Sequence, residues 1–129
     1  MARGSCVSSV LIVGAGIAGL SLAAALRQQG IEARLFEAKT GFEPEGTGLH
    51  LPGNAVRAAR RLGLETVVDR RAYRIAQITY TDEAGRQLTT LDLARARGIL
   101  RKWPPFVALP RPVFHEALVD LVGVENISF

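Results

Sequence analysis

The first part of the chain shows a strand-like, then a helix-like, then again a strand-like pattern of apolar positions. The apolar run over 9–13 predicts a short buried strand. Small residues and leucines over 17–29 predict a helix, and Gly30 stands where a glycine commonly ends one. Apolar and polar residues alternate over 31–37, which predicts a second strand. We therefore expect an α/β chain that opens with a right-handed βαβ unit and two parallel strands.

The pattern is interrupted over 38–55, where glycine and proline are frequent and predict a loop. A helix is expected next from residue 54, ending near Gly63, followed by a short second helix over 65–71. Asn54 is expected to cap the first of these helices. Its inward positions are expected to be Val56, Ala59 and Leu62.

Period-two alternation returns over 73–93, on both sides of an Asp/Gly turn, and predicts a β-hairpin. A loop anchored by Trp103 follows, and the segment 112–123 predicts an amphipathic helix. The apolar face of that helix is expected to be Phe114, Leu118 and Leu121. The final residues 125–129 are expected to begin another strand.

Composition places the chain among ordinary soluble globular proteins, since 48% of its 129 residues are hydrophobic and 22% are charged. Cys6 is the only cysteine, so no disulfide can form within the chain, and we expect a cytoplasmic protein. The apolar run near the N-terminus is too short to span a bilayer, so no membrane association is expected.

The chain carries a net charge of +4, and its excess arginines concentrate in the helical region. Aromatic residues do not alternate with these arginines, as a stacking surface for nucleic acid would require. We interpret the cluster as a solvated helix face and expect no nucleic-acid partner. The arginines are Arg57, Arg60, Arg61, Arg70, Arg71 and Arg74.

Three glycines stand between the first strand and the first helix, at positions where glycine weakens both kinds of element. Gly14, Gly16 and Gly19 have the spacing G-x-G-x-x-G of a dinucleotide-binding turn. We expect Gly14 to form the tight turn and Gly19 to let the helix approach the strand. Gly16 is expected to let a pyrophosphate approach the backbone, in a conformation that valine cannot readily adopt.

An acidic residue completes the pattern, because Glu37 ends the second strand 18 residues after Gly19. Amides at the helix N-terminus, around Ile17 and Ala18, would face the phosphates, and Glu37 would accept hydrogen bonds from ribose hydroxyls. A carboxylate there would repel a 2′-phosphate, which favours FAD or NAD over NADP. The motif alone leaves the choice between FAD and NAD open.

Two later stretches resemble a known family. "GTGLHLPGNAVRAARRLGL" and "LPRPVFHEAL" resemble elements of single-component FAD-dependent aromatic hydroxylases of the p-hydroxybenzoate hydroxylase type. With the glycine motif, three motifs occur in the family's order over nearly the whole chain. The resemblance implies a Rossmann-like FAD-binding domain over residues 1–129, with the hairpin at 73–93 starting the substrate domain.

The resemblance also implies the cofactor contacts. The backbone of Gly46–Gly48 would run near the flavin, and Arg111 would reach phosphate or ribose oxygens. Where the family usually has a basic residue directly after the acid, this chain has Ala38, with Lys39 one step later. The expected contacts are Gly14, Gly16, Ile17, Ala18, Gly19, Glu37, Lys39, Gly48 and Arg111.

The implied parent enzyme hydroxylates or epoxidises a small, aromatic molecule with NAD(P)H and O2. Relatives are longer and carry later Asp-Gly and Gly-Asp elements. The chain is therefore expected to be an inactive N-terminal piece that binds FAD weakly or not at all and that self-associates. The flavin would carry the chemistry, and no catalytic acid or base is assigned.

His50 and His115 lie far apart in the sequence, so no metal site is expected. His115 is interpreted as a partly exposed structural residue. The alternatives are an NAD-dependent dehydrogenase domain and a non-catalytic nucleotide-binding module.

Overall fold

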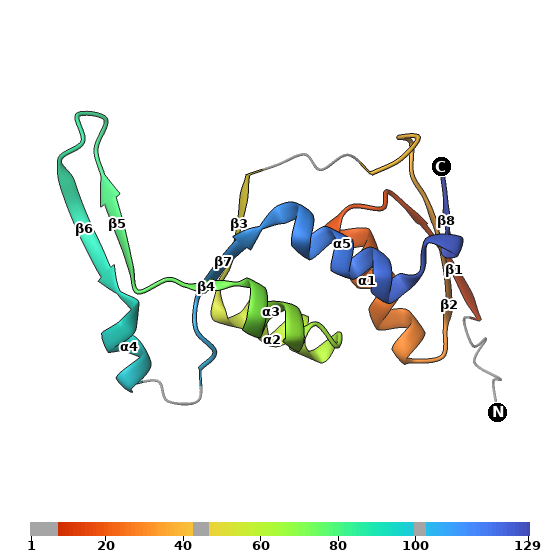
Figure 1. Cartoon of the computed structure of the whole chain (residues 1–129), viewed down its shortest axis with the longest axis horizontal. Helices are drawn as coiled ribbons and strands as arrows, with labels where there is room; N and C mark the ends of the chain where they lie inside the picture. The colour runs from red at the N-terminus through yellow and green to blue at the C-terminus, as the bar shows by residue number, and fades with distance from the viewer. Residues whose placement is uncertain (1–7, 43–46, 100–102) are drawn as a thin grey trace, which may run out of the picture. The chain divides into compact units, whose positions relative to one another are not determined.

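The structure is a computed structural model that describes residues 8–42, 47–99 and 103–129. The chain divides into two compact units, each of which is described by itself (Figure 1). The first unit comprises residues 1–46 and 112–129, and the second comprises residues 47–111.

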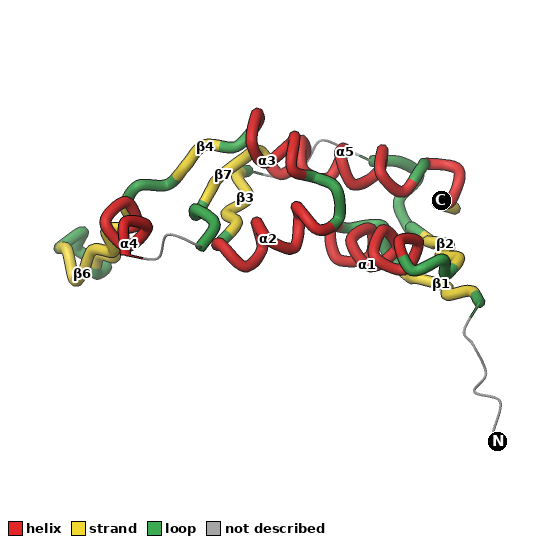
Figure 2. The backbone as a smooth tube through the Cα atoms, turned by 90° about the horizontal axis from the view of Figure 1, so that it is seen from below, coloured by secondary structure: helices red, strands yellow, loops and turns green. Residues whose placement is uncertain are grey.

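The first unit is built on a parallel three-stranded sheet with the strand order β1-β2-β8. Its strands are β1 (Ser9–Val13), β2 (Glu32–Phe36) and β8 (Ile127–Ser128). Its helices are α1 (Ile17–Gln28), α5 (Arg111–Val122, all but its first residue in this unit) and the short 3-10 helix η1 (Val124–Asn126). Figures 1 and 2 show α1 and α5 on the same side of the sheet. The sequence predicted β1 and the parallel β1-α1-β2 unit correctly.

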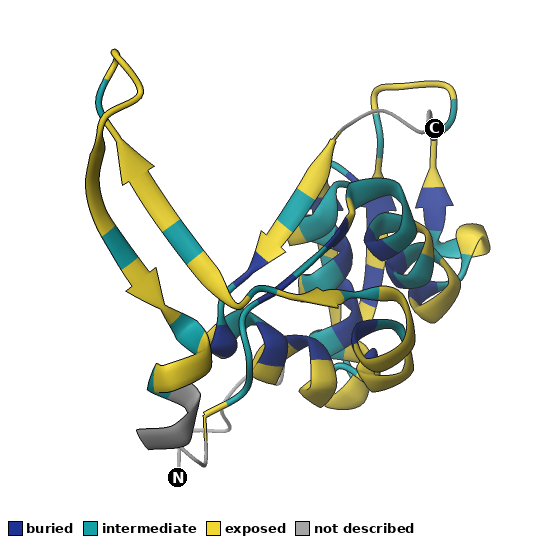
Figure 3. Cartoon of the chain, turned by 60° about the vertical axis from the view of Figure 1, so that its left-hand side comes forward, coloured by how far each residue is buried: buried dark blue, intermediate teal, exposed yellow. Residues whose placement is uncertain are grey.

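The core of the first unit lies between the sheet and its two helices, and alternation along the strands decides which side chains enter it. Ile12, Ala33 and Leu35 point into the core, where they are at most 7% exposed. The helices contribute Leu20, Ala23, Ala24, Phe114, Leu118 and Val122. On the other face of the sheet, Leu11 is 69% exposed and Val13 is 91% exposed. Figure 3 colours the ribbon by the burial of each residue.

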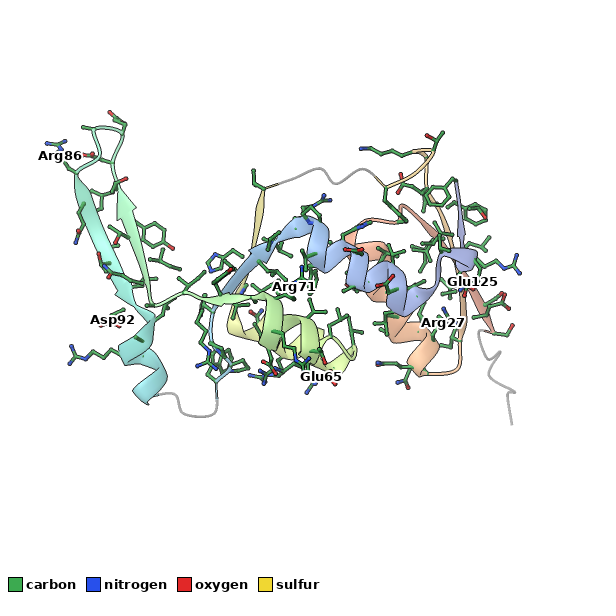
Figure 4. The ribbon with its side chains drawn as sticks, viewed as in Figure 1. Arg27, Glu65, Arg71, Arg86, Asp92 and Glu125 are labelled. Carbon is green, nitrogen blue, oxygen red and sulfur yellow. The ribbon has the colours of Figure 1, made fainter. Side chains whose placement is uncertain are left out.

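The second unit contains an antiparallel sheet with the order β3-β7-β4, together with two helices. The strands are β3 (Gly48–Leu51), β4 (Tyr73–Arg74) and β7 (Val107–Pro110). The helices are α2 (Gly53–Arg61) and α3 (Glu65–Arg71), and Glu65 and Arg71 mark the ends of α3 in Figure 4. The buried side chains here include Leu51, Val56, Ala59, Leu64, Val68, Val107 and Leu109.

A separate hairpin extends from this unit. It consists of β5 (Gln77–Thr81) and β6 (Gln87–Asp92), and α4 (Leu93–Ile99) follows. Asp82 organises its tip, because its Oδ1 accepts hydrogen bonds from the amides of Ala84 at 3.0 Å and Arg86 at 2.8 Å. Both the backbone and the side chain of Arg86 lower the pKa of Asp82. Figure 4 shows Arg86 at the tip and Asp92 beside α4.

Several expectations for the part of the chain after β2 are wrong in detail. The segment 38–55 is not a continuous loop, because it contains β3 and the start of α2. The hairpin is shorter than 73–93, since Tyr73 and Arg74 pair with β7 instead. The expected loop after the hairpin contains α4 and β7.

Two helix details also differ. Pro52, and not Asn54, occupies the N-cap of α2, and Asn54 is exposed within the first turn. The buried stripe of α5 continues from Leu118 to Val122, while Leu121 is 40% exposed. A spacing of four residues keeps a stripe on one side of a helix, and Val122 fits that spacing better than Leu121 does.

Candidate functional site

The glycine turn between β1 and α1 is held tightly against the sheet. Gly14 has a φ of 95°, a left-handed conformation that favours glycine, and its amide donates to the Phe36 carbonyl at 2.7 Å. A Cβ on Gly19 would collide with the carbonyl oxygen of Gly14 and would lie 3.3 Å from Ile12 Cγ2. Both glycines therefore do what their spacing predicts: Gly14 turns the chain, and Gly19 lets α1 lie close to β1.

Gly16 differs from its two neighbours in the motif. Its backbone, with φ of −76° and ψ of −179°, is an extended conformation that any residue adopts, so the expectation that valine cannot adopt it is wrong. A Cβ placed there would meet nothing within 4 Å. The fold itself does not require glycine at this position, and the open space beside it fits a ligand that approaches the backbone.

The N-terminus of α1 begins at this open space. Gly16 is the N-cap, no side chain caps the helix, and its first turn has no acidic residue. The first amides of a helix have no acceptor within the helix, and they carry the positive end of its dipole. The amides around Ile17 and Ala18 therefore suit a phosphate group.

Glu37 follows β2 and is tied to the same turn. Its Oε2 accepts a hydrogen bond from the Ala15 amide at 2.8 Å, and its Oε1 accepts one from the Lys39 amide at 3.1 Å. These bonds from Lys39 and then Ala15 lower the pKa of Glu37, because both stabilise the charged carboxylate. Each oxygen keeps a further lone pair for a ribose hydroxyl. The sequence predicted the ribose role and missed the structural one.

The other side of Ala15 is contacted by a residue for which the sequence predicted only a structural role. His115 Nε2 lies 2.8 Å from the Ala15 carbonyl oxygen, and its half-buried ring meets Phe42 edge-on with centroids 4.7 Å apart. His115 and Ala15 are 100 residues apart in sequence, so no local pattern could have revealed the contact.

The remaining predicted contacts lie in the second unit. Gly48 pairs with Pro110 across β3 and β7, and the amide of Arg111 donates to the Thr47 carbonyl at 3.2 Å. Gly48 and Arg111 therefore lie at the same end of that sheet. Gly46 lies outside the described residues.

Other candidate chemistry finds little support. Trp103 anchors its loop as expected: Arg57 stacks over its ring at 4.7 Å, and a Cβ on Gly53 would collide with it.

Over residues 8–42, 47–99 and 103–129, no three side chains are grouped to hold a metal ion. In the same ranges no helix is both long and apolar enough to cross a membrane.

A family profile described as an FAD binding domain matches residues 7–122. The chain belongs to this family. FAD is therefore the cofactor, which resolves the choice that the glycine motif left open between FAD and NAD.

Relatives of this FAD-binding domain are flavin-dependent enzymes. It is 35% identical over 114 residues to 3-amino-4-hydroxybenzoate 2-monooxygenase PtnB3 of Streptomyces platensis, covering 88% of this chain and 28% of that protein. It is 35% identical over 120 residues to FAD-dependent monooxygenase pynG of Aspergillus niger, covering 90% and 26%. The chain therefore spans about 30% or less of these relatives.

A solved structure confirms the fold of the FAD-binding domain. HpxO of Klebsiella pneumoniae, complexed with FAD and uric acid, matches with a TM-score of 0.76 at 24% identity, covering 94% of this chain and 30% of that one. The mixed α/β architecture expected from the sequence is that of FAD-binding flavoprotein monooxygenases.

Proposed function

We propose that this FAD-binding domain serves a flavin-dependent monooxygenase that inserts one oxygen atom into a small ring compound, with NAD(P)H and O2 as co-substrates. The observation that carries the cofactor part of the proposal is the side-chain-free space at Gly16, directly at the uncapped N-terminus of α1. The monooxygenase relatives support the type of reaction. Glu37 stands next to the space at Gly16 through its bond to the Ala15 amide. An anion acceptor beside a carboxylate matches the pyrophosphate and ribose of a dinucleotide.

In this proposal, different residues of the first unit bind different parts of the cofactor. The amides of Gly16, Ile17 and Ala18 bind the pyrophosphate, and Gly14 and Gly19 shape the turn that presents them. Glu37 accepts hydrogen bonds from the adenosine ribose, and its lowered pKa keeps it ionised and able to accept. Lys39, Gly48 and Arg111 stay as contacts predicted by the family resemblance.

The bound flavin supplies the redox chemistry that NAD(P)H and O2 require. The described residues bind and orient, and none of them is assigned as a general acid or base. The catalytic role of this domain is therefore to fix the adenine end of FAD.

The names of related proteins support a substrate class for this proposal. One relative is named for a hydroxybenzoate, and HpxO was solved with uric acid. Both compounds are small, planar and conjugated, and we propose a substrate of that class for the whole protein. Arg60 of α2 pairs with Asp69 of α3, whose Oδ1 lies 2.6 Å from its Nη2, and this exposed pair supports a solvated face without a nucleic-acid role.

We also propose that the chain self-associates. Strand β1 is the end strand of its sheet among the described residues, and Leu11 and Val13 are exposed on its outer face. An end strand with an apolar face is a surface on which a second chain can add.

An amide NMR titration of the 129-residue chain tests the binding site. FAD at millimolar concentration should shift the amides around Gly14, Gly16 and Glu37 in a saturable way, even if the affinity is low. NADP⁺ serves as the control, because its 2′-phosphate would meet the Glu37 carboxylate. No saturable shift with FAD, or equal shifts with both nucleotides, would contradict the proposal. For the whole protein, NAD(P)H oxidation that depends on O2 and on an added phenol or purine tests the activity.

A further inference from the structure

Both sides of Ala15 are held by side chains from outside the glycine turn. Its amide donates to Glu37 Oε2 at 2.8 Å, and its carbonyl oxygen lies 2.8 Å from His115 Nε2. Ala15 itself is 1% exposed, so water has little access to replace either partner. The Glu37 bond belongs to the dinucleotide motif, whereas the His115 bond comes from α5, and the sequence predicted only a structural role for His115.

This contact determines which ring nitrogen of His115 carries a proton. A carbonyl oxygen only accepts, so Nε2 carries a proton and donates it to Ala15. The ring is oriented by Phe42, whose own ring lies 5.1 Å from that of Phe129. His115 also follows the buried Phe114, which fixes the face of α5 from which the imidazole emerges.

The orientation of the Ala15 carbonyl also determines the orientation of the Gly16 amide. The carbonyl of Ala15 and the amide of Gly16 belong to one planar peptide unit, and no described peptide bond is cis. In a trans peptide the C=O and N–H point in opposite directions. Holding the Ala15 carbonyl toward His115 therefore directs the Gly16 N–H away from His115.

We propose that His115 is a positioning residue of the FAD-binding domain: its Nε2–H holds the Ala15 carbonyl and thereby aims the Gly16 amide at the pyrophosphate. The inference rests on the proposed function, because it assumes that the Gly16 amide faces the cofactor. A purely structural histidine would support α5 through its ring packing alone, and the direction of the Gly16 amide would not depend on its donor.

Two substitutions separate the donor from the ring. His115→Phe keeps a ring against Phe42 and removes the donor. His115→Gln removes the ring and keeps an N–H close to the position of Nε2. Glu116→Gln is the matched control, since Glu116 is the next residue on α5 and is exposed.

The first measurement needs no cofactor. In NMR spectra of the free chain, His115→Phe should shift the Gly16 amide resonance and the Ala15 carbonyl-carbon resonance, because these two groups form the peptide unit that loses its donor. His115→Gln should restore both toward wild type, and Glu116→Gln should leave both unchanged. Wild-type Gly16 and Ala15 signals in His115→Phe would overturn the proposal whether or not FAD binds.

The second measurement is the affinity for FAD by the same titration. Loss of one hydrogen bond that orients the site should weaken binding about three- to tenfold in His115→Phe. His115→Gln should stay within about twofold of wild type. Equal affinities in wild type and His115→Phe, or equal losses in both variants, would refute the positioning role. Failure of the wild-type chain to bind FAD would instead contradict the proposed function.

Discussion

Gly16 and Gly19 belong to one motif, but glycine serves a different purpose at each position. A pair of substitutions should separate the two purposes. At Gly16 the backbone is ordinary and a Cβ meets nothing within 4 Å, so Gly16→Ser fits the free fold. Serine is also a slightly better N-cap than glycine, by about 0.3 kcal/mol. The free energy of unfolding should therefore stay the same or rise slightly.

Gly19→Ala should act in the opposite way. Alanine in place of glycine within a helix normally stabilises it by about 1 kcal/mol. Here the new methyl group would meet the Gly14 carbonyl oxygen, which is backbone and cannot rotate away. Overpacking costs about 1–3 kcal/mol, and a collision with rigid backbone belongs at the upper end of that range. A cost of about 3 kcal/mol less the helix gain of about 1 kcal/mol leaves a net loss of about 2 kcal/mol.

Urea unfolding and FAD titration of the same two variants provide the assay. Gly16→Ser should lose saturable FAD shifts while keeping its urea midpoint, because its side chain occupies the space proposed for the pyrophosphate and caps the same amides. Gly19→Ala should unfold at lower urea concentration. Wild-type FAD affinity in Gly16→Ser would refute the pyrophosphate assignment, and an unchanged midpoint in Gly19→Ala would refute the close approach of α1 to β1.

Two further predictions concern Glu37 and the exposed face of β1. Glu37→Gln should weaken FAD binding modestly, since the amide keeps one acceptor, and Glu37→Arg should weaken it more, since it keeps none; titrations that match wild type for both would exclude Glu37 from the ribose site. Folding lowers the pKa of Glu37, so the stability that its carboxylate contributes is present above the unfolded pKa and is lost as the pH falls through the folded pKa. Acid should therefore destabilise wild type more than Glu37→Gln. Light scattering over a concentration series should show self-association that Val13→Lys reduces and the matched Arg34→Lys does not; a monomer at all concentrations would contradict it.

The βαβ unit could be predicted from the sequence because its signals are local. The apolar run of β1, the spacing along α1 and the positive φ that ends the helix at Gly30 all lie within a short window. The strand β2 then pairs with β1 in the register that alternation requires, with Ile12 opposite Leu35. Short connections leave few alternative topologies for such a unit.

The second sheet could not be predicted because its strands are short and their partners are distant. Strand β7 follows Pro104 and Pro105 and ends at Pro110, and these prolines favour a loop when only neighbouring residues are considered. Its pairing with Gly48 at one edge and Tyr73 at the other supplies the hydrogen bonds that stabilise it. Tertiary contacts of this kind override local preference.

The candidate site shows the same division between local and distant information. The motif encodes two requirements at once: Gly19 satisfies the packing of the free fold, whereas Gly16 leaves a space that the fold does not use. Glu37 serves both, because its carboxylate secures the Ala15 amide and remains able to accept from a ribose. A match to the motif alone therefore cannot separate a structural glycine turn from a binding one. The distinction lies at Gly16 and in the partners that aim its amide, and His115 is the partner that only the folded chain brings there.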